Sequence, residues 1–183
     1  MKTIRPSTEN ALIEAAFALL NQNPKTSLAD IAAYAGVGRA TLHRHFSGRE
    51  DLIQVLVLQA INETEAAADE ASKHSDSYSA ALEQIFKAII PLGNRHWFLA
   101  QEHGQSDKKI NRKLKQQNKA MSKLVNHAKL EGLFNSQLPN SWIMQTYDHM
   151  IHAAWEMIRT EQSTISQATE LAWQTLINGL QGK

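Results

Sequence analysis

The chain has 183 residues, of which 43% are hydrophobic and 20% are charged, a balance typical of a folded protein rather than a disordered one. It contains no cysteine, which excludes disulfides, thiolate metal sites and cysteine nucleophiles. The formal net charge is only +1, so a nucleic-acid partner would have to be inferred from where the charges lie.

No stretch approaches the roughly 18 apolar residues that a membrane-spanning helix needs, and the polar N-terminus lacks the apolar centre of a signal peptide. We therefore expect a cytoplasmic protein with no membrane partner. Apolar residues recur at helical spacing and alternation with a period of two is absent, which predicts an all-α fold of about nine helices.

The first expected helix runs from Ser7 to about Asn21, and its apolar positions, Leu12 and Phe17 among them, recur on one face. Lys2 and Arg5 precede it and form a short basic arm, which could contact a phosphate or simply fray. Pro24 separates this helix from the next. Ser27 followed by Asp30 predicts a capping box at the start of that second helix.

A short joint, Gly36-Val37-Gly38, separates the second helix from a third, and its glycines suit a tight turn with positive φ. In the third helix Leu42 and Phe46 lie four residues apart and form a buried stripe. The residues between them are small or can donate hydrogen bonds to an anion. Two short helices in this arrangement are typical of a helix-turn-helix, whose second helix enters the DNA major groove.

The charge of residues 1–50 gives modest support for DNA binding, since this segment contains six basic and four acidic side chains. We expect Arg39 and Arg44 to reach base edges and Ala40 to contact a thymine methyl. Phosphate contacts are expected from the other polar residues of the motif, although either histidine could instead cap the helix C-terminus. The complete predicted DNA-binding set is Ser27, Arg39, Ala40, Thr41, His43, Arg44, His45 and Arg49.

These residues also carry a family resemblance. The runs Ile31-Ala32, Gly36-Val37, Thr41-Leu42-His43-Arg44-His45-Phe46 and Arg49-Glu50-Asp51-Leu52 resemble the DNA-binding domain of the tetracycline-repressor (TetR) family of bacterial regulators, over roughly residues 9–55. The chain departs from the family by having His43 where a tyrosine is usual and Gly38 where a serine-like cap is usual. At the position of Arg49 the family has a phosphate-binding lysine.

The resemblance implies a homodimeric repressor that a small organic ligand releases from a palindromic, double-stranded DNA operator. It predicts a DNA-binding domain over residues 1–50 and a ligand-binding and dimerisation domain over residues 51–183. The sequence around the boundary, Ser47-Gly48-Arg49-Glu50, predicts a second capping box. It would open a long helix to about Lys73 that links the two domains.

The larger domain contains an aromatic set with a few polar tips, which fits an organic-ligand pocket and equally fits a core. The predicted ligand-binding residues are Phe86, Trp97, Phe98, His103, Met121, Tyr147, Met150 and Trp155. A helix over about residues 106–131 has a basic outer face from Lys108 to Lys123, either a solvated surface or a second anion contact.

Two terminal helices, over about residues 140–160 and 163–180, have more apolar surface than one small bundle covers. They predict a four-helix interface between two copies, although both faces could instead close the core of one chain. The predicted interface residues are Trp155, Ile158, Ile165, Ala168, Ala172, Leu176 and Gly179.

Catalytic motifs are missing: there is no G-x-S-x-G sequence and no glycine-rich phosphate loop, so we expect no enzyme and no cofactor. His149 and His152, three residues apart beside Asp148, raise a metal-sensor alternative, but the sequence shows no obvious further ligand and we predict no metal site. The other alternative is a helix-turn-helix module that serves an architectural or protein-interaction role without a ligand.

Overall fold

The computed structural model describes residues 7–101 and 107–181, and within these ranges all the regular structure is helical. The all-α expectation is confirmed, with nine α-helices in the described part of the chain. None of the described helices is long and apolar enough to span a bilayer. The helices are α1 (Thr8–Gln22), α2 (Leu28–Tyr34), α3 (Arg39–His45), α4 (Arg49–Ser72), α5 (Tyr78–Ile89), α6 (Gly93–Ala100), α7 (Lys108–Leu130), α8 (Asn140–Arg159) and α9 (Ile165–Leu180), and the 3₁₀ turn η1 (Ile90–Leu92) precedes α6.

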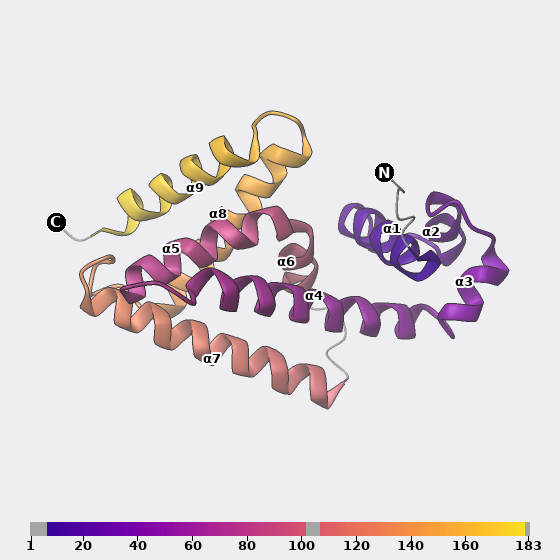
Figure 1. The fold of residues 1–183 in the computed structure, drawn as a ribbon, viewed down its shortest axis with the longest axis horizontal. Coiled ribbons are helices and arrows are strands. Elements are labelled where there is room, and N and C mark those ends of the chain that lie inside the picture. The colour runs from indigo at the N-terminus through magenta and orange to yellow at the C-terminus, as the bar shows by residue number, and fades with distance from the viewer. Residues whose placement is uncertain (1–6, 102–106, 182–183) are drawn as a thin grey trace.

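The first three helices form a compact unit at one end of the molecule (Figure 1). The predicted capping box of α2 is present, because the Ser27 hydroxyl accepts from the Asp30 amide and the Asp30 carboxylate accepts from the Ser27 amide. Gly36 adopts φ +71° in the turn between α2 and α3, where a glycine avoids the strain that a Cβ would bring. Leu42 and Phe46 are buried as predicted.

The second predicted capping box is wrong. Gly48 occupies the N-cap of α4, and the structure shows no side-chain cap there. The Ser47 amide and hydroxyl both donate to the Asp51 carboxylate, at 2.8 and 3.0 Å, so Asp51 takes the part that the sequence pattern gave to Glu50. The cause is a shift of one residue, since the helix begins after Gly48 and Ser47 lies outside it.

Two hydrophobic cores follow one another along the molecule, and α4 extends from the first to the second (Figure 1). The first core contains the buried sides of α1 to α3, the first half of α4 through Ile61, and two residues from further along the chain, Phe98 and Ile110. The second contains α5, η1 and most of the apolar residues of α7 to α9. Because α4 has no break between the cores, the boundary at residue 50 stays a prediction.

The short helix α6 lies between the two cores and contacts α1, α4 and α8. Gly93 at its start packs directly on Trp155 of α8, and a Cβ built on Gly93 would lie only 2.4 Å from the Trp155 Cβ. Glycine therefore permits a closer approach of α6 to α8 than any larger residue would. This contact holds α6 against α8, between the first three helices and the larger domain.

Candidate functional site

The outer face of α3 is the first candidate surface. Burial of Leu42 and Phe46 turns the intervening side chains outward, and Arg39, Ala40, His43, Arg44 and His45 are all exposed. The face thus presents two arginines and two histidines to solvent at one end of the molecule (Figure 1). Such a surface can donate to base edges and phosphates without moving the core.

Contacts on this face hold some of its side chains in place. The Arg44 guanidinium donates to the Thr41 hydroxyl at 3.0 Å, which joins a predicted base-reading residue to a predicted phosphate contact. His45 Nδ1 lies 3.8 Å from the carboxylate of Glu9 on α1. Gly38, the N-cap of α3, supplies no side-chain cap, which leaves the first amide groups of the helix available to an anion.

Arg49 has a second role that the sequence did not indicate. Its guanidinium donates to the backbone carbonyls of Pro24 and Thr26, and the residue is half-buried. Arg49 therefore joins the start of α4 to the loop between α1 and α2. That loop leads directly into Ser27, whose hydroxyl lies 2.6 Å from the Asp30 carboxylate.

Another aromatic residue of this unit was not on the predicted list. Tyr34, the last residue of α2, is 65% exposed, a large value for an aromatic side chain beside a core. The predicted basic arm, Lys2 and Arg5, lies outside the described residues.

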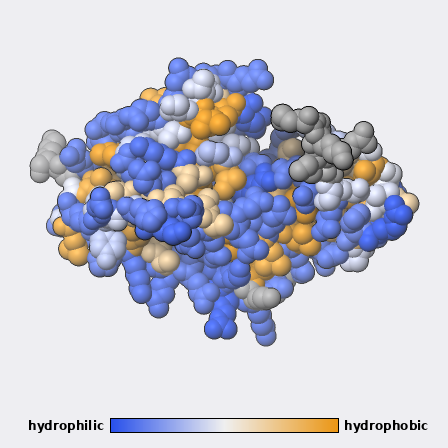
Figure 2. Space-filling model, in the orientation of Figure 1, coloured by the Kyte–Doolittle hydropathy of each residue, from blue (hydrophilic) through white to orange (hydrophobic). Residues whose placement is uncertain are grey.

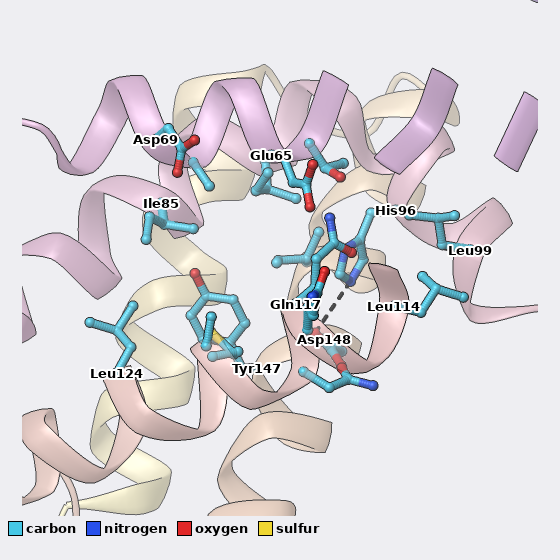
Figure 3. A pocket seen from close by; sticks show the side chains of 18 of the residues that line it. Glu65, Asp69, Ile85, His96, Leu99, Leu114, Gln117, Leu124, Tyr147 and Asp148 are labelled. Atoms are coloured by element: carbon cyan, nitrogen blue, oxygen red, sulfur yellow. Dashed lines mark ion pairs between the residues drawn. The ribbon is translucent and has the colours of Figure 1, made fainter. Parts of the chain in front are cut away.

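A cavity of about 700 Å³ in the larger domain is the second candidate site. It lies among α4, α5, α6, α7 and α8, and its volume is in the range of pockets that hold drug-sized ligands. Figure 3 shows side chains from these helices around a common space, with Glu65 and Asp69 on one side and Tyr147 on another. The cavity has an apolar part and a polar part.

The structure brings two of the predicted ligand-binding residues, Met121 and Tyr147, to this cavity. Phe86 and Phe98 are fully buried in the second and first cores, so neither lines it. Periodicity marks a residue as apolar but does not separate a packed core position from a cavity wall.

The remaining predicted ligand-binding residues lie elsewhere. The Trp97 ring stacks on His152 with a centroid separation of 3.7 Å, and Trp155 packs against Gly93. Met150 packs against the second core. His103 lies outside the described residues.

The polar lining of the cavity was missed in the sequence. Glu65 and Asp69 lie one turn apart on α4, and Asp148 lines the cavity from α8 (Figure 3). The Nε2 atom of His96, on α6, lies 3.4 Å from the Asp148 carboxylate. The Tyr147 hydroxyl donates to the Leu82 carbonyl at 3.1 Å. Burial, and secondarily the charge of Asp148, raises the Tyr147 pKa well above its usual value, so the phenol stays neutral.

On the side of α6 that faces α1, polar contacts join the pocket region to the first three helices. Arg95 donates to Glu14 of α1 and, at 2.8 Å, to Glu63 of α4. The side-chain amide of Asn21 donates to the Asn94 carbonyl at 2.8 Å. His96 lines the cavity, so neighbouring residues of α6 face the cavity on one side and α1 on the other.

Part of the predicted dimer surface is unavailable. Ala168, Ala172 and Leu176 are buried against the second core, which corrects their assignment as contact residues, because the stripe of α9 that they share closes the chain's own core. Trp155 and Ile158 are half-buried, whereas Ile165 and Gly179 are exposed.

A side of α9 next to the buried stripe remains open to solvent. Leu171 is 55% exposed, and Thr175, about one turn further along, is exposed as well. Figure 2 shows hydrophobic surface near the junction of α8 and α9. A second copy would contact this exposed side rather than the buried stripe.

Hydrophilic side chains project from the α7 side of the molecule (Figure 2). Lys108, Arg112, Lys115, Lys119 and Lys123 are exposed there, as expected of a solvated helix face.

The histidines of α8, His149 and His152, were the predicted alternative for a metal sensor. Among the described residues, no group of three or more histidine, aspartate or glutamate side chains is placed to hold a metal ion. Burial lowers the pKa of His152, and nearby histidines and Arg159 add to the effect against the opposing charge of Glu156. Its Nδ1 is buried without a hydrogen-bond partner.

Comparisons with known proteins agree with this geometry. Residues 12–56 match the family described as bacterial regulatory proteins, tetR family. The chain is 29% identical over 153 residues to the HTH-type transcriptional repressor LfrR of Mycolicibacterium smegmatis, an alignment that covers 83% of this chain and 79% of that protein.

The fold is also similar to solved structures. A crystal structure of LfrR in complex with proflavine matches with a TM-score of 0.73 and 25% identity, over 96% of this chain and 97% of that one. The ketosteroid regulator KstR2 of Mycobacterium tuberculosis matches with a TM-score of 0.72 over 99% and 98% of the two chains, and its 19% identity supports the fold alone.

Proposed function

Because this chain belongs to the TetR family of bacterial regulatory proteins, which regulate transcription and are not enzymes, we propose that it is a homodimeric repressor of a palindromic operator. A small organic molecule in the cavity among α4 to α8 releases the DNA. The observation that carries the proposal is the exposed basic face of α3, held outward by the burial of Leu42 and Phe46.

On DNA, α3 lies in the major groove. Arg39 and Arg44 read base edges, with guanine the favoured partner of an arginine, and Ala40 contacts a thymine methyl. Thr41, His43, His45 and Ser27 bind phosphates and set the register. Arg49 supports these contacts through its hydrogen bonds to Pro24 and Thr26, which hold the loop before Ser27.

Two copies pair through the outer faces of α8 and α9, so that two α3 helices reach successive half-sites of one operator. The exposed side chains of Leu171 and Thr175 support this arrangement. Thr175 and Gly179 are small, and small residues let a partner helix approach closely.

Release of the DNA follows from the position of α6. A ligand that contacts His96 or Leu99 acts on the helix whose neighbouring residues hold α1 through Arg95 and Asn94. A shift of α6 on ligand binding would then move the first three helices and change the separation of the two α3 helices in the dimer. The ligand can shift the equilibrium between the two arrangements by no more than the difference between its binding free energies for them.

The test begins by selecting duplexes from a random pool with the full-length protein. We expect an inverted repeat and a complex with two protein chains per duplex. The logarithm of the binding constant should fall linearly with the logarithm of the salt concentration, with a slope of roughly −0.9 per neutralised phosphate. A thermal-shift screen should then find organic compounds that raise the melting temperature and weaken the complex. If the selection enriches no sequence, DNA recognition is overturned. If it yields an inverted repeat but the screen finds no stabilising compound, a ligand-independent module is favoured.

A further inference from the structure

We infer that the cavity among α4 to α8 selects an organic cation, an assignment that rests on the proposed function of the cavity as the effector site. The cavity is lined by three carboxylates, those of Glu65, Asp69 and Asp148, and no lysine or arginine is among the described residues that line it. The charged part of the lining is thus predominantly acidic.

The carboxylates differ in how far the chain neutralises them. Asp148 has His96 at 3.4 Å, and Glu65 has the Lys113 ammonium at 3.7 Å. No ion pair within 4.0 Å joins Asp69 to a cation in the described part of the chain. Lys73, the cation one turn further along α4, lies 3.7 Å from Glu70 instead.

Glu65 and Asp69 are four residues apart on α4, so their side chains emerge on the same face of the helix. Figure 3 shows both of them directed into the space between α4 and Tyr147. A positive group placed there is attracted by both carboxylates at once. An anionic group would lie beside two like charges with no lysine or arginine in the lining to receive it.

The rest of the lining fits the body of such a ligand. Ile85, Leu114, Leu124 and Ile151 supply apolar walls, which hold a hydrocarbon or aromatic framework. The Tyr147 hydroxyl is already bonded to the Leu82 carbonyl and the side chain is only 2% exposed, so this residue offers a ligand no free donor. A cation gives the Asp69 carboxylate a partner, whereas a neutral ligand that covered this carboxylate would leave it without one.

The test uses three ligands of one shape and different charge: N-methylacridinium, a permanent cation; acridine, neutral at pH 8; and acridine carboxylate, an anion. Binding to the full-length protein is measured by fluorescence titration. We expect the cation to bind at least about tenfold more tightly than acridine, and the anion more weakly than either. Equal affinities, preference for the anion, or no binding of the cation would overturn the inference.

Asp69→Asn and Glu65→Gln separate charge recognition from shape. Each should reduce the preference for the cation by about three- to tenfold while the affinity for acridine stays unchanged. Glu70→Gln is the matched control, because Glu70 is exposed like Asp69 but is paired with Lys73 and absent from the lining. If Glu70→Gln reduces the preference as much as Asp69→Asn does, bulk charge rather than the cavity is responsible.

Binding of each protein to a selected duplex is measured in parallel, without ligand and with each compound. Release of the duplex by neutral acridine and not by the cation would overturn the charge assignment and keep the proposed function. A cation that binds through Asp69 without weakening the DNA complex would keep the charge assignment and overturn the proposed release mechanism.

Discussion

Arg95 and Phe17 meet where α6 crosses α1, with the guanidinium carbon of Arg95 lying 4.6 Å from the centroid of the Phe17 ring. Phe98 contacts the same ring edge-on at 5.2 Å, and Arg95 also donates to Glu14 and Glu63. A cation over an aromatic face with two carboxylates around it is a directional contact that a simple apolar patch would not provide. The position of α1 therefore depends on that of α6.

Replacing Arg95 by methionine tests this dependence. Arg95→Met keeps the length of the side chain but leaves Glu14 and Glu63 without their cation. We expect a loss of about 1–3 kcal/mol in the free energy of unfolding, between the values for exposed and for buried pairs, because Arg95 is largely buried and Glu14 is not. We also expect a weaker effector response: the factor by which an effector lowers DNA affinity should be at least about five times smaller in Arg95→Met than in the parent protein.

Arg159→Met is the control for that experiment, because Arg159 is bonded only to Glu156 on its own helix and lies over Trp155 at 6.0 Å. It should leave the effector response unchanged. Gel shifts with and without effector, together with thermal melts, measure both quantities. A normal effector response in Arg95→Met would show that the Arg95 contacts do not transmit the change.

Arg39 and Arg49 should differ in what they contribute to DNA binding. Arg39 is exposed on α3, so Arg39→Ala should cost ~1–3 kcal/mol on the selected duplex and relax the base preference at one position. Arg49→Ala should weaken binding to all duplexes alike, and it should also lower the melting temperature, because the carbonyls of Pro24 and Thr26 lose their donor. Lys123→Ala, a charge-matched change on α7, should alter neither.

Gel shifts against the selected and a scrambled duplex distinguish these effects. If Arg39→Ala weakens both duplexes equally, Arg39 contacts the backbone and not a base. If neither Arg39→Ala nor Arg49→Ala changes binding, the assignment of α3 as the reading helix fails.

Local patterns predicted the first three helices well, because caps and turns depend on residues a few positions apart. Ser27 and Asp30 form their predicted box, and Gly36 takes the positive φ that the turn needs. The error at Ser47 is equally local. Two acidic residues follow Gly48, and the pattern alone did not show that the helix would start late enough for Asp51 to receive the hydrogen bonds.

The pocket was harder to predict because it depends on contacts between helices distant in the chain. Phe86 and Tyr147 are both aromatic residues at apolar positions that recur with helical periodicity, yet only Tyr147 lines the cavity. The carboxylates of Glu65 and Asp69 were visible as a pair on one face of a helix. Sequence alone did not show that this face borders a cavity, because charged residues are usually on the solvated surface.

The proposed dimerisation through the exposed side of α9 would make Leu171 a contact residue. Leu171→Glu places a charge on that side, so we expect light scattering to report a particle of 20.5 kDa for the variant and twice that mass for the parent. DNA affinity should fall with it, because one α3 helix binds only one half-site. Leu130→Glu, the same change at a residue of α7 that is 79% exposed, should leave both properties unaltered.

His152 should give the folding stability a pH dependence near neutrality. Burial lowers its pKa in the folded chain below the ordinary value of 6.5, so protons bind more readily to the unfolded chain. The contribution to stability is complete above about pH 6.5 and is lost as the pH falls towards the folded-state pKa. His152→Phe retains a ring to stack on Trp97 and cannot be protonated, so its melting temperature should fall less between pH 7.5 and pH 5 than that of the parent. His74→Phe, at an exposed histidine, should keep the parent's pH profile, and identical profiles for all three proteins would show that the buried ring of His152 is not the group responsible.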